Sequence, residues 1–271
     1  MHHETPAGRG VVRTLLGLAA AVASLGAAAQ DNPPLTDSWH VVVGAGVLSG
    51  PRYPGASERR TLAAPLLGAT YGRYFFGGAP GTGTPAGIGA YLVDDAHWKA
   101  GVGVGMDFRK PRKESDDPRL AGLGDIDGTA RASLFANYTD GWLGVNSNLS
   151  TDVGGHEEGT LFNLDLEGRY RVGDHLVLSA GPGLEFADKK YAQTFFGIDG
   201  AQSLRSGRAE YSAKGGLNTI RFSVGANYAL TPQWGIGLRG TVSELHGSAA
   251  DSPVTGKKNQ DTFGLFASYR F

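Results

Sequence analysis

The sequence predicts an all-β fold, a transmembrane antiparallel up-and-down β-barrel of about twelve strands. Segments of about 10 residues alternate apolar and polar side chains, short and long connections alternate along the chain, and aromatic residues gather beside the short connections. Strands of water-soluble proteins average about 5–6 residues, whereas a tilted strand needs about 9–11 residues to cross a bilayer. The length of the alternating segments therefore favours a membrane barrel.

The start of the chain has the features of an export signal. Arg9 and Arg13 supply positive charge, residues 15–28 form a short apolar run, and alanines 27–29 match a signal-peptidase cleavage site. We therefore expect residues 1–29 to be a signal peptide and residues 30–271 to form the barrel.

Composition excludes several classes of protein. The chain has no cysteine, so disulfides and thiolate metal sites are excluded. Its formal charge of -1 gives no reason to expect a nucleic-acid partner. After the signal, no apolar run reaches the roughly 18 residues that a membrane-spanning helix needs. The 43 glycines lie largely inside alternating segments, which indicates crowded interior positions or tight bends in strands.

The clearest strand covers residues 162–172, where Phe162, Leu164 and Leu166 share one face and acids and arginines share the other. Counting from the C-terminus, we place twelve strands at 38–48, 61–70, 73–78, 86–93, 97–108, 128–138, 142–152, 160–172, 175–187, 217–229, 233–245 and 262–271.

The least secure step is the division of residues 61–78 at Tyr71-Gly72-Arg73. One undivided strand would give an odd number, and Pro65 weakens the strand pattern there. Ten strands is the alternative.

The connections alternate in length. Short turns are predicted at 94–97, 139–141, 173–175 and 230–233, and long segments at 49–60, 109–127, 188–214 and 246–261. Outer-membrane barrels have short periplasmic turns and long extracellular loops.

Aromatic residues next to the short turns predict one girdle at the periplasmic membrane boundary, where amphipathic rings are favoured. The predicted girdle consists of Trp39, Trp98, Tyr138, Trp142, Tyr170, Tyr228, Trp234 and Phe271.

The chain stops within a strand, at Phe271. In a closed barrel the last strand pairs with the first, so we expect the chain to end where this strand meets the periplasm. A terminal aromatic after alternating apolar residues also resembles the signal that the bacterial outer-membrane assembly machinery recognises. Phe266 is the one bulky residue on the polar face of this segment.

If the apolar faces contact lipid, charged side chains line the interior. The predicted lumenal cluster is Asp165, Glu167, Arg169, Arg171, Glu185, Arg221, Arg239 and Arg270. Neither sign dominates, so we interpret the cluster as ion pairs that fix strand register. A pore lining that selects solute charge is the alternative.

Candidate chemical motifs are weak. Ser243, Glu244, His246, Ser248, Asp251 and Ser252 are local neighbours that could form a hydrolase site, but polar loop residues at the membrane surface are the commoner explanation. Residues 124–128 resemble the start of a calcium loop, yet Ala136 stands where the bidentate carboxylate belongs. The GVGVG segment at 101–105 is expected to be strand and not a phosphate loop. We expect no catalytic residue, metal or cofactor.

Several segments resemble the MipA/OmpV family of outer-membrane proteins, also described as MltA-interacting proteins. They are Gly50–Phe76, Gly122–Thr129, Tyr191–Ile198, Ser206–Leu217, Ser243–Thr255 and the final Tyr-Arg-Phe. The resemblance implies an outer-membrane barrel of a Gram-negative cell. For one branch it implies a scaffold that links a murein-degrading lytic transglycosylase to a murein-synthesising penicillin-binding protein. Other members are described as adhesins or porin-like proteins.

Three functions therefore remain open: a non-enzymatic scaffold, a small-solute channel or adhesin, and an outer-membrane hydrolase. Two of the family segments lie in long connections, which predicts loops packed into or over the barrel.

Overall fold

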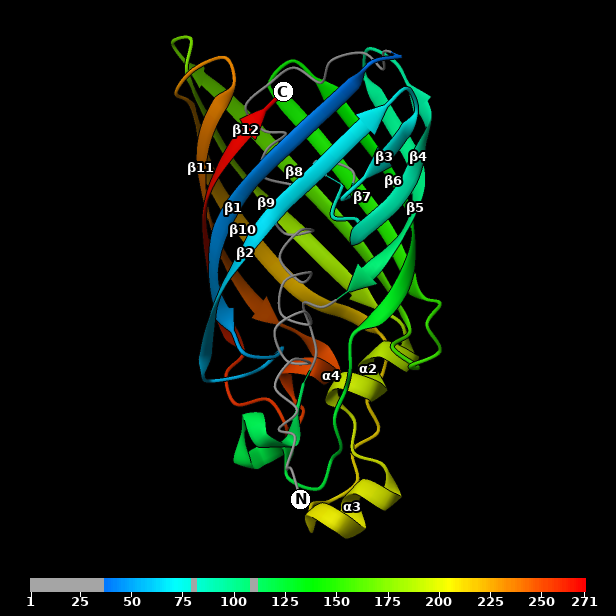
Figure 1. Ribbon diagram of the computed structural model, residues 1–271. Coiled ribbons are helices and arrows are strands. Elements are labelled where there is room, and N and C mark those ends of the chain that lie inside the picture. The colour runs from blue at the N-terminus through cyan, green and yellow to red at the C-terminus, as the bar shows by residue number, and fades with distance from the viewer. Residues whose placement is uncertain (1–36, 79–81, 108–111) are drawn as a thin grey trace, which may run out of the picture.

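The computed structural model describes residues 37–78, 82–107 and 112–271, and these form a closed barrel of twelve antiparallel strands (Figure 1). The twelve-strand prediction is confirmed, and the ten-strand alternative is wrong. The predicted signal peptide lies outside the described residues. The strands are β1 (Trp39–Pro51), β2 (Arg59–Tyr71), β3 (Tyr74–Phe76), β4 (Ala86–Asp94), β5 (Trp98–Asp107), β6 (Thr129–Asp140), β7 (Leu143–Asp152), β8 (Thr160–Val172), β9 (Leu176–Ala187), β10 (Gly216–Ala229), β11 (Trp234–Leu245) and β12 (Asn259–Arg270).

The barrel closes between its first and last strands. β1 and β12 pair in register from Val42 opposite Arg270 to Ser49 opposite Phe263. One residue further, the backbone N–H of Phe271 donates to the carbonyl of Val41 at 3.0 Å. The last residue thus belongs to the seam that closes the ring, which explains why the alternating pattern runs to the end of the chain.

The division at Tyr71-Gly72-Arg73 is confirmed, but β3 has three residues where six were predicted. β2 continues through Pro65, which lies opposite Ala45 of β1. Within the described residues, β3 covers the other edge of β2 only at Ala69–Tyr71. Proline is tolerated beside an edge without a hydrogen-bonded partner, because it has no N–H to donate.

The glycine-rich segment is strand β5, as predicted. A methyl group on Gly101 would lie 2.7 Å from Cζ of Phe135, so only glycine leaves room for this ring on the inner face. Phe135 packs there with Phe75 and Tyr91, with ring centroids 5.8–6.0 Å from its own. The glycines therefore serve side-chain packing, not phosphate binding.

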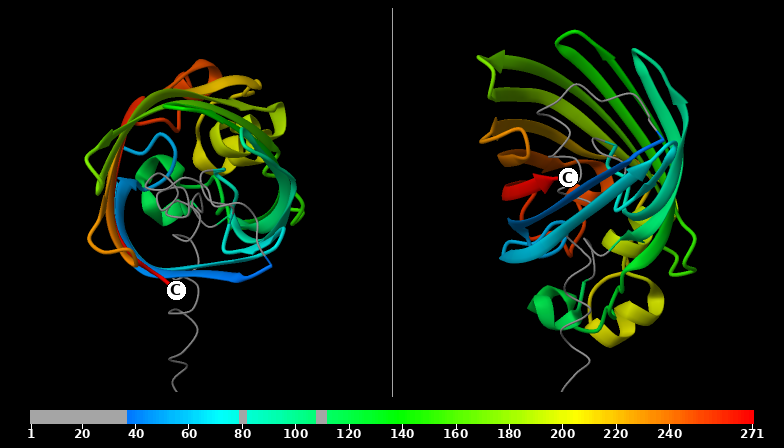
Figure 2. Two further views of the ribbon diagram at one scale, coloured as in Figure 1. Left: turned by 90° about the horizontal axis from the view of Figure 1, so that it is seen from above. Right: turned by 45° about the horizontal axis from the view of Figure 1, so that its top comes forward.

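The helices of the described residues lie at the end of the barrel that carries the long loops, below the ring of strands in Figure 1 and in the tilted view of Figure 2. They are α2 (Lys189–Phe196), α3 (Gly200–Ser206), α4 (Gly247–Ala250) and the 3-10 turns η3 (Glu114–Asp116) and η4 (Pro118–Leu120). None of the helices in the described parts of the chain is both long and apolar enough to cross a membrane.

Two loop helices begin at aspartate N-caps, which the strand pattern of the sequence does not indicate. Asp188 Oδ1 accepts a hydrogen bond from the N–H of Tyr191 at 2.7 Å, and Asp199 Oδ1 accepts one from Gln202 at the same distance. Each cap satisfies a backbone donor that the first turn of a helix leaves free.

The β1–β12 seam can be tested with a disulfide, because the natural chain has no cysteine. Ala45 and Ala267 are opposite each other and both face outward. Opposed strand residues lie within the Cα separation that a disulfide tolerates. The Ala45→Cys/Ala267→Cys variant should therefore cross-link on oxidation, visible as a changed mobility of the denatured protein on a gel. The control Ala45→Cys/Phe263→Cys, four residues out of register, should not. Equal cross-linking of both would contradict the register.

Candidate functional site: the loop cap and the charged lumen

The long loops form a compact cap with its own hydrophobic core. Tyr191, Phe195 and Phe196 of α2 are almost fully buried in it. The core gathers side chains from the loop ends of several strands and from four connections: Tyr53, Ala56, Leu120, Leu123, Leu161, Ala187, Tyr191, Ala192, Phe195, Phe196, Ile198, Ala213, Leu245, Ala249 and Val254. Burying a Val, Leu, Ile or Phe side chain stabilises a loop arrangement by about 1.5–3 kcal/mol. The cap is therefore a folded unit, as the family segments in these loops predicted.

Hydrogen bonds between loops join the cap together. Arg112 Nη1 donates to the carbonyl of Phe195 at 2.8 Å, and Ser252 Oγ donates to that of Phe196 at 2.6 Å. Gln202 Nε2 reaches the carbonyl of Leu123 at 2.7 Å. These bonds tie α2 to the loops before β6 and β12, and α3 to the loop before β6.

Burial shifts the pKa values of two ionisable groups inside the cap. Burial lowers the pKa of Arg112 to about 10, although surrounding carboxylates oppose the shift. Burial, together with the charge of Asp117, raises the pKa of Tyr53 to about 12. At neutral pH Arg112 is therefore still charged and Tyr53 is neutral. Both residues serve the packing of the cap and offer no group poised for acid–base chemistry near pH 7.

Inside the barrel, Asp165 and Arg221 form a bidentate ion pair between β8 and β10. Arg221 Nε lies 2.8 Å from Oδ1 of Asp165, and Nη2 lies 2.7 Å from Oδ2. The remaining guanidinium nitrogen donates to Asn163 Oδ1 at 3.0 Å. Two parallel charge-assisted bonds give the pair a fixed geometry. The pair spans β9, which lies between the two strands.

Glu167 is the centre of a second group. Its carboxylate accepts from Arg169 Nε at 2.8 Å and from Arg239 Nη1 at 3.3 Å. Glu185 accepts from Asn218 Nδ2 at 2.8 Å. Arg171 lies at the short-turn end of β8, and Arg270 is half-buried near the end of β12. Five of the eight predicted lumenal residues thus make ion pairs with one another, while a role for the cluster in solute selection stays a prediction.

Sequence reasoning missed one buried ion pair. Arg131 of β6 and Glu158 of the β7–β8 loop are nearly inaccessible, with Nη1 and Oε2 3.6 Å apart. Arg131 Nη2 also donates to the carbonyls of Ser150 and Gly159 at 3.0 Å. The alternating pattern of β6 placed Arg131 on the polar face of the strand. Its partner Glu158 lies in a loop, and no strand pattern indicates where a loop lies.

The structure places the eight aromatic residues of the predicted girdle at the short-turn end, at or beside strand ends. Trp142 and Tyr170 are about two-thirds exposed. Other girdle rings contact neighbours: the centroids of Trp98 and Tyr138 are 5.0 Å apart, and Trp234 lies 5.1 Å from Tyr269. Contact of this ring of aromatics with a membrane boundary remains a prediction.

The candidate hydrolase residues are dispersed by the fold. Ser243 Oγ donates to the carbonyl of Gln260, Ser252 Oγ donates to Phe196, and Ser248 Oγ accepts from the N–H of Lys214. His246 Nε2 lies 4.0 Å from Glu244. Among the described residues no hydrogen bond joins one of these serines to His246, and nucleophilic catalysis requires such contact.

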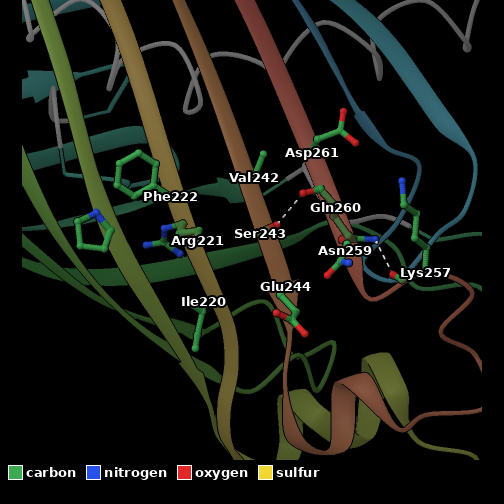
Figure 3. Close-up of a pocket in the computed structure, with 11 residues that line it drawn as sticks. Ile220, Arg221, Phe222, Val242, Ser243, Glu244, Lys257, Asn259, Gln260 and Asp261 are labelled. Atoms are coloured by element: carbon green, nitrogen blue, oxygen red, sulfur yellow. Dashed lines mark hydrogen bonds between the residues drawn. The ribbon is translucent and has the colours of Figure 1, made fainter.

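Next to Ser243 lies an open depression of about 500 Å³ in the wall formed by β10, β11 and β12 (Figure 3). Its lining mixes the apolar side chains Ile220, Phe222 and Val242 with the polar ends of the strands. The mixture fits the place where the lipid-facing wall meets the loops, and it adds no catalytic constellation to Ser243.

Together, the closed ring of strands, the apolar outer wall and the charged interior define an outer-membrane β-barrel protein. A protein-family model described as MltA-interacting protein MipA matches residues 43–271, and the chain belongs to this family.

Individual similarities are more distant. The chain is 26% identical over 163 residues to YiaT of Escherichia coli K12, whose name describes an outer-membrane protein. This match covers 58% of the chain and 63% of YiaT. Among solved structures, OmpT of Vibrio cholerae has 15% identity and a TM-score of 0.35, covering 86% of this chain and 64% of OmpT. The NanC porin has 8% identity and a TM-score of 0.40, and the match covers 86% of this chain and 100% of NanC.

Replacing Glu167 should expose its structural role. The Glu167→Gln variant leaves two arginines without their countercharge in a partly desolvated lumen, which should lower the free energy of unfolding by about 1–3 kcal/mol. Urea unfolding in vesicles measures this. The matched control is Glu157→Gln, whose side chain is 78% exposed in its pair with Lys190, and its effect should be within about 0.5 kcal/mol of zero. Equal stability of both variants would show that the lumenal pairs are dispensable.

Proposed function

We propose that this protein is a non-enzymatic scaffold that holds murein-processing enzymes at the periplasmic face of the outer membrane. The observation that carries the proposal is the folded loop cap, in which Phe195 and Phe196 seal α2 into a core shared by several loops. A cap of this kind disfavours free passage of solutes along the barrel axis. It leaves the periplasmic rim as the accessible working surface.

The family description supports a protein partner, because it names interaction with MltA. We infer that the partner is a lytic transglycosylase of this type, and that a penicillin-binding murein synthase is the second enzyme. The periplasmic turns are short, including Gly72-Arg73 and the turn 173–175, so they offer a small surface. Stable interfaces bury about 1,600 Å². The complex should therefore be weak, or should also use the segment before β1.

A pull-down tests the scaffold. The detergent-solubilised barrel, immobilised through a tag, should retain a purified MltA-type transglycosylase. Reversing charge in the periplasmic turn with Asp174→Lys/His175→Glu should reduce retention. The matched control is Leu204→Ser on α3, a residue that is 89% exposed at the opposite end of the barrel. This variant should retain the enzyme fully. No retention by the parent barrel would contradict the scaffold proposal. Loss of retention with Leu204→Ser would show that the contact lies on the cap, as expected of an adhesin-like surface.

A small-solute channel is the second candidate, and the observation in its favour is the charged lumen. The side chain of Asp165 is 32% exposed and that of Arg239 is 27% exposed, so water reaches these groups. A channel would give steady conductance in planar bilayers, and Arg221→Gln would shift its ion selectivity toward cations. A silent bilayer would rule this candidate out.

A further inference from the structure

The depression beside Ser243 lies on the outer face of the barrel wall (Figure 3). Phe222 of β10 and Val242 of β11 line it, lie opposite each other in the register, and are 47% and 60% exposed. Ser223, the next residue along β10, is buried on the inner face. A volume of about 500 Å³ lies within the range of about 300–1,000 Å³ that ligand sites have. The depression is therefore open to whatever surrounds the barrel, and it is large enough for part of a ligand.

A polar rim borders the depression at the loop end of the strands. It consists of Glu244, Lys257, Asn259 and Asp261. In the register of β11 and β12, Val242 is opposite Asp261 and Glu244 is opposite Asn259. The outer wall thus changes from apolar to charged within the depression, between Val242 and Glu244. A change of this kind on the outside of a membrane barrel marks the level where hydrocarbon gives way to lipid headgroups.

The rim carries both signs of charge. The side chains of Glu244 and Asp261 are 57% and 53% exposed. Asp261 forms an ion pair with Arg59. Glu244 lies 4.0 Å from Nε2 of His246, which is charged only when protonated. Lys257 forms no ion pair with any residue in the described part of the chain. A carboxylate without a permanent countercharge and a lysine ammonium are therefore both available to a ligand in the depression.

On the side away from the loops, the outer wall has room for a hydrocarbon chain. Gly240 lies on the same face of β11 as Val242, opposite Val224 of β10 and Phe263 of β12. Val224 and Phe263 are both 49% exposed. A methyl group on Gly240 would meet only Cγ2 of Val224, at 3.7 Å, which is an ordinary van der Waals contact. The missing side chain therefore leaves a low strip of apolar wall next to the depression.

We propose that the depression is a binding site for a zwitterionic phospholipid of the phosphatidylethanolamine class. The lipid ammonium donates hydrogen bonds to the carboxylate of Glu244, and Lys257 attracts the lipid phosphate. One acyl chain lies on Phe222 and Val242 and continues over Gly240. A primary ammonium has three N–H donors and suits a carboxylate, whereas the acids of the rim repel a headgroup that carries only a phosphate. The lipid site is independent of the scaffold role, because it lies at the loop end of the strands.

Native mass spectrometry of the full barrel in detergent tests the proposal. The barrel is mixed with equal amounts of phosphatidylethanolamine, phosphatidylcholine and phosphatidylglycerol that carry the same acyl chains. Phosphatidylethanolamine should be retained at least about threefold more than either competitor, a preference typical of exposed charged contacts. Choline has no N–H to donate, and phosphatidylglycerol has no cation. Equal retention of the three lipids, or preferential retention of phosphatidylglycerol, would overturn the proposal.

Two charge variants locate the headgroup. Glu244→Gln should abolish the preference for phosphatidylethanolamine over phosphatidylcholine. Lys257→Gln should lower the retention of both lipids, because both carry a phosphate. The matched controls are Glu157→Gln and Lys190→Gln, which remove the charges of an exposed ion pair elsewhere in the loops and should bind lipid as the parent does. An unchanged preference in Glu244→Gln would overturn the proposed contact with the ammonium.

A third variant tests the position of the acyl chain. Gly240→Phe fills the low strip and should reduce retention of phosphatidylethanolamine at least about threefold. The control is Ala132→Phe, which adds the same ring to the outer face of β6, two residues from the exposed Leu134. Equal retention by these two variants would contradict the proposed site. If Gly240→Phe does not fold, as judged by gel mobility before heating, Gly240→Val is measured by the same criterion.

Discussion

The structure depends on one constraint: inside a bilayer, backbone N–H and C=O groups must find partners within the protein. A ring of twelve strands meets this requirement only if the first and last strands pair, and the β1–β12 seam does so over eight residue pairs. The alternation of side chains then follows from the pleat, with apolar residues toward lipid and charged residues inside. Ion pairs such as Asp165–Arg221 are a consequence, because charges that face a narrow lumen are stabilised by opposite charges across neighbouring strands.

The same constraint explains why the two ends of the barrel differ. At one end the strands are joined by short turns of a few residues, with aromatic side chains at or beside the strand ends. The long loops lie outside the hydrocarbon and are free to fold as a water-soluble unit would, with capped helices and an apolar core around Phe195 and Phe196.

Much of the barrel could be predicted from the sequence because the bilayer imposes a period of two over long segments. β8 was predicted at its observed bounds, and the split before Arg73 followed from the need for an even strand number. The predicted length of β3 was wrong. The predicted strand ran through Gly77 and Gly78, but the positive φ angles of these two glycines end β3 at Phe76. Phe266 broke the polar pattern of β12, and only the fold shows that Ala64 and Leu66 of another strand surround it.

The loop cap was predicted in outline but not in detail. The caps at Asp188 and Asp199 are local signals that single-strand periodicity does not capture. The pairing of Arg131 with Glu158, and of Arg112 with the carbonyl of Phe195, depends on contacts between distant segments. Patterns within one segment carry no information about such contacts, and residue types alone do not fix them.

The central claim is that the strands form one closed, hydrogen-bonded ring in the membrane. Hydrogen–deuterium exchange of the protein in lipid vesicles, followed by mass spectrometry of its peptides, tests it most directly. The account predicts that amides at 42–49 of β1 and 263–270 of β12 exchange as slowly as those of the β8–β9 pair in the middle of the chain. Rapid exchange at both terminal strands, with β8 and β9 protected, would show an open sheet and contradict the account.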